Sequence, residues 1–210
     1  LRITKPHIVI EGIASVYNKK TFTNTSTTKI IFYSGTLHKR FGILNLIEAF
    51  KLIPYSNYSL QICGVGDSVD FIKKEEIKDS RIKYLGQLSR DRVLNLQRKS
   101  TVLINPRQNN EEFTKYSFPS KTLEYLSSGV PVIAYKLDGI PDEYDAYINY
   151  VKDNSIESLK DKILEICQLP DLEREDMGKK GMNFVLKTKN RINQTKKIVD
   201  MVNDIILKGE

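Results

Sequence analysis

Short apolar runs alternate with amphipathic stretches along most of this chain. Residues 29–54 predict a buried strand, a turn that contains glycine, and a helix whose apolar positions recur at helical spacing. Residues 58–67 predict an apolar strand that ends at two glycines, and shorter strands are predicted within 81–89 and 101–106. Alternating strands and helices are typical of an α/β fold, in which ligands bind at the carboxyl ends of the strands.

The stretch SFPSKTLEYLSSGVPVIAY, residues 117–135, predicts a short helix followed at once by a buried strand. Pro119 suits the first turn of a helix, where a missing N–H costs nothing. Gly129 suits the C-terminal end, and Pro131 prevents the helix from continuing. We therefore expect a helix near 119–128.

Three polar side chains share one face of this expected helix. Ser120 and Glu124 are four residues apart and Lys121 and Glu124 are three apart, so all three lie together while Leu123 and Leu126 turn toward the sheet. A basic and an acidic group beside free backbone N–H groups suit a ligand that carries both phosphate and sugar hydroxyls. The alternative is a solvated first turn in which Lys121 and Glu124 pair only with each other.

The rest of the chain adds connecting and C-terminal elements. Residues 21–29 are polar and without pattern, which indicates a loop. A short last strand is expected at 147–152, and the helix after it has Ser155 as its expected N-cap. Two further helices are expected near 171–186 and 190–207.

Taken together, these segments resemble the C-terminal, donor-binding domain of a family 4 glycosyltransferase of the GT-B fold. The resemblance covers roughly residues 8–152, through EGI (11–13), YSGTL and FGILNLIEAF (33–50), LQICGVGD (60–67), YLGQLS (84–89) and the stretch 117–135. It implies a Rossmann-like, doubly wound parallel sheet, the C-terminal half of a GT-B fold, with extra C-terminal helices. The F-P-S-K stretch is similar to that of bacterial surface-polysaccharide transferases.

The resemblance also divides the chain. Residues 1–28 are expected to form an interdomain segment and loop, and residues 29–210 a nucleotide-sugar donor-binding domain with terminal helices. The chain starts without Met in what looks like an interdomain segment, so the N-terminal acceptor-binding domain is expected to be absent. Because a GT-B active site lies between two domains, we expect this part to hold the donor but to be inactive alone.

The resemblance implies transfer of a sugar, with retention, from a nucleotide-diphosphate donor to a glycan or lipid-linked acceptor. A diphosphate leaving group gains negative charge as the anomeric bond breaks, so the site needs N–H groups and cations. Gly35 and Thr36 let the backbone approach the ligand, and Lys39, Arg40 and Lys121 are candidate counter-charges.

Two departures affect this phosphate site. Thr36 stands where the family usually has arginine, and Phe41 stands where it usually has lysine. We therefore expect Lys39 or Arg40 to substitute for the missing charges.

The paired glutamates of the family are also altered. Glu124 corresponds to the second glutamate and is expected to accept hydrogen bonds from the ribose hydroxyls. The position of the first holds Tyr116, and either Glu111 or Glu112 could be brought to the sugar by a longer loop. Glu112 and Lys121 are the candidate catalytic residues.

The full set of expected donor-binding residues spans four loops and the predicted helix start. It comprises Gly35, Thr36, Lys39, Arg40, Gly64, Gly66, Tyr84, Leu85, Gly86, Lys115, Tyr116, Ser117, Phe118, Pro119, Ser120, Lys121 and Glu124. The donor is expected to be a UDP- or GDP-sugar, with no cofactor. No D-x-D motif occurs in the sequence, so no metal is expected, and His7 and His38 are interpreted as surface residues.

Composition limits the classes of binding partner and the cellular location that we expect. The net charge of +7 fits nucleic acid, an anionic membrane or an anionic ligand, but no nucleic-acid-binding signature accompanies it. The basic stretch 187–197 is either a solvated helix face or a patch for peripheral membrane association. Cys63 and Cys167 form no metal or disulfide pattern, and no run reaches the roughly 20 apolar residues of a membrane span. We expect a cytoplasmic protein, with the inner membrane face as the alternative.

Two other functions fit the same fold. A nucleotide-sugar epimerase of the GT-B fold would also bind a nucleoside diphosphate in this cleft. A non-catalytic nucleotide-binding module is the second alternative.

Overall fold

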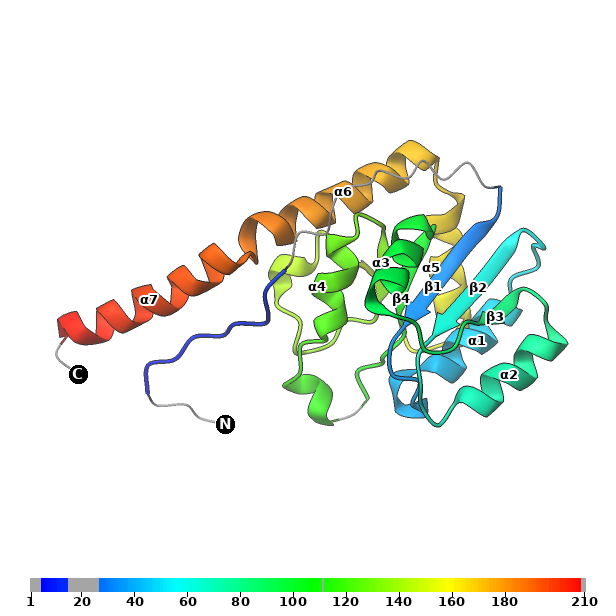
Figure 1. Cartoon of the computed structure of the whole chain (residues 1–210), viewed down its shortest axis with the longest axis horizontal. Helices are drawn as coiled ribbons and strands as arrows, with labels where there is room; N and C mark the ends of the chain where they lie inside the picture. The colour runs from blue at the N-terminus through cyan, green and yellow to red at the C-terminus, as the bar shows by residue number, and fades with distance from the viewer. Residues whose placement is uncertain (1–4, 15–26, 111, 209–210) are drawn as a thin grey trace.

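A six-stranded parallel sheet forms the centre of the computed structural model, which describes residues 5–14, 27–110 and 112–208 (Figure 1). The strands lie in the order β3-β2-β1-β4-β5-β6, and every neighbouring pair is parallel. The strands are β1 (Lys29–Ser34), β2 (Tyr58–Cys63), β3 (Ile82–Tyr84), β4 (Val102–Asn105), β5 (Val132–Ala134) and β6 (Asn149–Tyr150). This order confirms the expected doubly wound α/β fold.

Helices cover both faces of the sheet. The α-helices are α1 (Ile43–Lys51), α2 (Val69–Lys78), α3 (Arg90–Lys99), α4 (Ser120–Ser127), α5 (Ile156–Gln168), α6 (Asp171–Thr188) and α7 (Arg191–Lys208). Three short 3-10 helices lie between them, at η1 (Lys39–Phe41), η2 (Glu112–Lys115) and η3 (Asp142–Tyr144).

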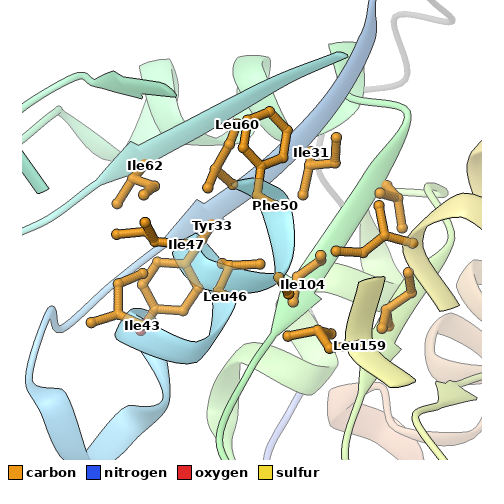
Figure 2. Packing of buried hydrophobic residues seen from close by; sticks show 14 of the residues in the cluster. Ile31, Tyr33, Ile43, Leu46, Ile47, Phe50, Leu60, Ile62, Ile104 and Leu159 are labelled. Carbon is orange, nitrogen blue, oxygen red and sulfur yellow. The ribbon is translucent and has the colours of Figure 1, made fainter. Parts of the chain in front are cut away.

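The strand side chains alternate between two hydrophobic clusters. Ile31 of β1 packs in one cluster with α1, α2 and α5, whereas Phe32 packs in the other with α4 and α6. The same alternation separates Ile104 from Leu103 on β4. Figure 2 shows the first cluster, in which side chains of β1, β2 and β4 face those of α1 and Leu159 of α5. Burial on both faces explains why these strands read as continuous apolar runs.

The observed elements match most of the sequence-based expectations. The helix expected near 119–128 is α4, and the side chain of Ser155 accepts a hydrogen bond from the backbone N–H of Ser158, which confirms it as the N-cap of α5. The sequence interpretation left out α2 and α3, which complete the connections to β3 and β4. The loop expected at 21–29 lies mostly outside the described residues.

The last two helices depart from the sheet. Figure 1 shows α6 crossing α4 and α7 projecting beyond the sheet. Several apolar side chains of α7 are exposed, with Ile192 at 71% and Ile206 at 69%. No helix in the described ranges is long and apolar enough to cross a membrane. Both cysteines are free and buried.

Candidate functional site

The site lies at the carboxyl ends of β1 and β4. These strands are neighbours in the sheet, and the connections that leave them run toward opposite edges. Such a switch point leaves a crevice between the two loops, because each loop turns away from the other. Gly35 follows β1 and Arg107 follows β4 by two residues, so both lie at this crevice.

Two glycines allow the loops after β1 and β2 to pack closely. A Cβ atom on Gly64 would lie 1.7 Å from the carbonyl oxygen of Gly35, and the φ angle of Gly64 is 138°. Gly35 has a φ of 143°, and a Cβ there would lie 1.8 Å from Nζ of Lys121. Gly64 therefore requires glycine for both backbone conformation and space, whereas Gly35 requires it for backbone conformation, because the Lys121 side chain can move aside.

Lys121 extends from the first turn of α4 into the space beside Gly35. Its Nζ also lies 5.8 Å from the centre of the Tyr33 ring. Burial lowers the pKa of Lys121 below its usual value, and the charge of Glu124 opposes that effect only in part. No carboxylate among the described residues forms an ion pair with Lys121, which argues against a closed Lys121–Glu124 pair.

Glu124 is oriented by a side chain from α3. Nε2 of Gln97 donates a hydrogen bond to Oε1 of Glu124 at 2.7 Å and another to Oγ of Ser34 at 3.3 Å. Gln97 is fully buried, and the hydroxyl of Tyr125 accepts a hydrogen bond from the backbone N–H of Ser34 at 3.0 Å. This buried network fixes the direction of the Glu124 carboxylate.

A cavity of about 610 Å³ opens beside Glu124, and we call it the first cavity. Its wall combines the loops after β1 and β2, residues 11–14, residues 87–88 and the exposed side of α4. Both Glu11 and Glu124 line it, together with Lys121. The first cavity therefore offers the Glu124 carboxylate as an acceptor together with a cation, as a ligand with hydroxyls and phosphate requires.

A second cavity of about 470 Å³ adjoins the first. The two share Thr36, Ser120 and Lys121. Arg40 and Arg107 also line the second cavity, whereas no carboxylate does so among the residues whose placement is described. The second cavity is thus lined by cations, whereas the first is lined by both acidic and basic side chains.

Residues 11–14 are fixed to the C-terminal helices. Nζ of Lys189 donates to Oε1 of Glu11 at 2.9 Å and also pairs with Glu143. Nε2 of Gln194 donates to the carbonyl oxygen of Gly12 at 3.0 Å. The junction of α6 and α7 thereby holds one wall of the first cavity.

The structure separates the expected site residues into two groups. Those that line one or both cavities are Gly35, Thr36, Arg40, Gly64, Ser117, Phe118, Pro119, Ser120, Lys121 and Glu124. Those outside both are Lys39, Gly66, Tyr84, Leu85, Gly86, Glu112, Lys115 and Tyr116.

Some residues of the second group support the loops. The hydroxyl of Tyr84 donates to the carbonyl oxygen of Gly64 at 2.9 Å, and the backbone N–H of Lys39 donates to Asp67 at 3.0 Å. Glu112 and Tyr116 are exposed, and Glu111 lies outside the described residues. The catalytic role of Glu112 stays a prediction.

The sequence interpretation missed Glu11, Gln97 and Arg107 as site residues, whereas Phe113 lies in the loop that it expected to contact the phosphates and the sugar. Arg107 had a usable signal, since it follows the carboxyl end of a predicted strand. Glu11 belongs to the EGI match but received no role. Gln97 lies on an unassigned helix, and its meeting with Glu124 is a tertiary contact that no local pattern carries.

The described residues contain no group of three or more His, Cys, Asp or Glu side chains placed to hold a metal ion. His38 is half-exposed and its Nδ1 lies 3.3 Å from Asp67, and His7 is exposed.

Comparison with known proteins gives a family and a fold. The family model described as "Glycosyl transferases group 1" matches residues 17–184. No curated protein matches the sequence.

Three solved structures illustrate the likeness. TarM of S. aureus, in complex with UDP and alpha-GlcNAc-glycerol, has a TM-score of 0.76 at 16% identity, over 93% of this chain and 39% of TarM. Anabaena HepE, in complex with UDP and glucose, has a TM-score of 0.68 at 14% identity, over 85% of this chain and 49% of HepE.

The catalytic domain of cholesterol-alpha-glucosyltransferase from Helicobacter pylori has a TM-score of 0.62 at 21% identity, over 76% of this chain and 98% of that one. At these identities the likeness shows the fold. The chain spans less than half the length of TarM and HepE.

Proposed function

The chain belongs to the group 1 glycosyl transferase family, and from this premise we propose that it is the donor-binding part of a retaining, family 4 glycosyltransferase that uses a nucleotide-diphosphate sugar. The observation that carries the proposal is the meeting of two cavities at Lys121. One cavity holds the carboxylate of Glu124, and the other is lined by arginines. A nucleoside diphosphate has the complementary order, with hydroxyls at one end and negative charge at the other.

The nucleoside occupies the first cavity in this proposal. Glu124, held by Gln97, accepts hydrogen bonds from the ribose hydroxyls. Residues 87–88 form the wall of the first cavity contributed by the loop after β3, where the base would lie. The diphosphate then reaches the shared wall at Thr36, Ser120 and Lys121.

Charge at the shared wall would assist departure of the diphosphate. As the anomeric bond breaks, the leaving oxygen gains negative charge. Lys121 offers a cation there, and α4 begins at Ser120, so the N-terminal end of the helix, where the dipole favours negative charge, lies at the same wall. The sugar passes to an acceptor hydroxyl with retention of configuration, as in the family that the sequence resembles.

The comparisons support a choice of donor. UDP is present in the TarM and HepE complexes, which favours a UDP-sugar over a GDP-sugar. A glycan or lipid-linked acceptor would bind with help from a domain outside this chain. We place the reaction in the cytoplasm, at or near the inner membrane face.

Calorimetric titration of the 210-residue chain with UDP, GDP and inorganic phosphate tests the binding part of the proposal. UDP should bind more tightly than phosphate. In Lys121→Ala, affinity for UDP should fall at least about tenfold and affinity for uridine should change little, because Lys acts as a point charge on phosphate.

Equal affinity for UDP, GDP and inorganic phosphate would refute donor binding. Equal losses of UDP and uridine in Lys121→Ala would make Lys121 a structural residue. Product analysis with the chain joined to an acceptor-binding domain separates transfer from epimerisation, since an epimerase releases an altered sugar without any acceptor.

A further inference from the structure

Arg107 is held in a fixed orientation by two aromatic rings. Its guanidinium carbon lies 4.4 Å from the centre of the Phe41 ring and 5.2 Å from that of Phe113. Nη1 also donates a hydrogen bond to Oγ of Ser117 at 3.2 Å. Stacking and hydrogen bonding together fix the plane of the guanidinium, so little rotamer freedom remains to be lost on binding.

Within the described residues, no carboxylate pairs with the cations around Arg107. Arg40, Arg107 and Lys121 all line the second cavity. Among the residues that the structure describes, none of these three forms an ion pair with a carboxylate. Burial and the charge of Arg40 lower the pKa of Arg107. Converging like charges disfavour one another unless an anion lies between them.

Arg81 shows how this chain treats an arginine that serves the fold. Its guanidinium donates to the carboxylate of Asp79 and to the carbonyl oxygens of Ile53 and Tyr55. The pKa of Arg81 is raised by Asp79. Arg107 has neither carboxylate nor carbonyl partners within the described part of the chain, and it lines the second cavity.

We infer that Arg107 binds the distal phosphate of the donor diphosphate, and that Phe41 and Phe113 are positioning residues for it. The assignment rests on the proposed function. It places the distal phosphate in the second cavity, because Glu124 lines only the first and Lys121 lines both. It also gives a role to Phe41, which stands where the family usually has a cation. The ring supports an arginine that comes from the loop after β4.

Titration of UDP and UMP into four proteins tests the role of Arg107, with GDP and GMP in parallel. The proteins are wild type, Arg107→Ala, Arg107→Lys and the control Arg191→Ala, which removes the same charge from an exposed position on α7. In Arg107→Ala, UDP affinity should fall at least about tenfold and UMP affinity less than about threefold. Arg107→Lys should recover part of the loss, and Arg191→Ala should bind as wild type.

If Arg107→Ala lost equal affinity for UDP and UMP, or lost none, the inference would be overturned while the proposed function stayed intact. Failure of the wild type to bind UDP or GDP would overturn both. A loss in Arg191→Ala as large as in Arg107→Ala would mean that only net charge matters.

A double-mutant cycle tests the positioning role of Phe41. Phe41→Leu keeps an apolar side chain but removes the ring, so it should weaken UDP binding several-fold in the wild-type background. It should have almost no effect when Arg107 is already Ala, because the ring acts through the guanidinium. An equal loss in both backgrounds would show that Phe41 does not act through Arg107. Thermal unfolding of each variant checks that the variant is folded under the conditions of the titration.

Discussion

Single side chains in the first cavity have their directions fixed by buried neighbours. Glu124 is exposed to the cavity on one side and accepts a hydrogen bond from the fully buried Gln97 on the other. Since Gln97 also reaches Ser34 on β1, the carboxylate is tied to the sheet and not only to its own helix. A ligand therefore meets a carboxylate that is already oriented.

Glu124→Gln should weaken binding of a ribonucleotide about tenfold or more, because a charged hydrogen bond contributes roughly 1.5 to 3 kcal/mol. The substitution keeps the shape of the side chain and removes its charge. Titration of UDP and 2′-deoxy-UDP into both proteins measures the effect.

The deoxy ligand lacks one hydroxyl, so it should bind the wild type weakly. Its affinity should fall less than that of UDP when Glu124 is replaced by Gln. Equal losses for the two ligands would contradict the assignment of Glu124 to the ribose.

Gly64 provides a second test at the scale of one residue, with Gly86 as a matched control. Both have positive φ, but a Cβ on Gly64 would lie 1.7 Å from the backbone of Gly35, whereas a Cβ on Gly86 would meet nothing within 4 Å. Gly86→Ala should lower the free energy of unfolding by about 1–2 kcal/mol. Gly64→Ala should lower it by more than about 3 kcal/mol, since backbone must also move. If urea denaturation gave similar losses of unfolding free energy for the two variants, the loops that contain Gly35 and Gly64 would not be closely packed in solution.

Among the helices, α4 packs closely against α6. Its C-terminal end meets α6, where a Cβ on Gly178 would lie 2.0 Å from the carbonyl oxygen of Gly129. Three residues later, a Cβ on Gly181 would meet the end of the Leu126 side chain at 2.8 Å. The first contact is with backbone and the second is with a side chain that can rotate. The crossing therefore depends on Gly178 more than on Gly181.

Gly178→Ala should destabilise the protein by about 2 kcal/mol or more, because overpacking of a helix crossing outweighs the gain in helix propensity. Gly181→Ala should be nearly neutral, since a gain of about 1 kcal/mol in propensity offsets a small rearrangement of Leu126. Thermal and urea unfolding of the two variants measure this. If Gly178→Ala did not destabilise the protein, α6 would have to cross α4 at a greater distance.

At the scale of the whole molecule, the first described residues and the last helices are joined. Glu11 and Lys189 form a buried ion pair at 2.9 Å, and Gln194 donates to the carbonyl oxygen of Gly12. Residues 11–14 therefore pack against the domain that the sequence assigned to 29–210. The same residues form a wall of the first cavity. These contacts of Glu11 and Gly12 with Lys189 and Gln194, which we call the joint, therefore connect the C-terminal helices with the site.

The joint should make stability depend on pH. Burial favours a higher pKa for the Glu11 carboxyl, but hydrogen bonds from Lys189, the backbone and Gln194 outweigh it and hold the pKa below its ordinary value. A carboxyl with a lowered pKa in the folded state contributes stability above its unfolded pKa and loses it as the pH falls through the folded value.

Glu11→Gln should therefore lower the free energy of unfolding by about 1–3 kcal/mol at pH 7 and by less below about pH 4. Urea denaturation at both pH values measures the difference, with the exposed Glu173→Gln as control. A difference between Glu11→Gln and wild type that does not shrink at low pH would contradict a charged pair at this joint.

Sequence pattern alone is sufficient to predict the layered fold and the position of α4. Apolar runs, turn glycines and helix-stop residues are local signals, because each reflects the conformational preference or burial of a few neighbouring residues. Ser120, Lys121 and Glu124 share a face for the same local reason, and the structure places all three on the first cavity. The phosphate and sugar roles given to them remain proposals.

Which residues from distant segments meet at the site depends on long-range packing. Gln97 reaches Glu124 from another helix, and Glu11 is held by a lysine 178 positions away. Phe41 reads in sequence as a lost charge, but in space it stacks on Arg107, which the loop after β4 supplies. Side chains at a strand-end crevice can come from any of several loops, so the same chemistry can arise from different positions. Local sequence pattern can place Arg107 after a strand end, but it does not show that Arg107 meets Phe41.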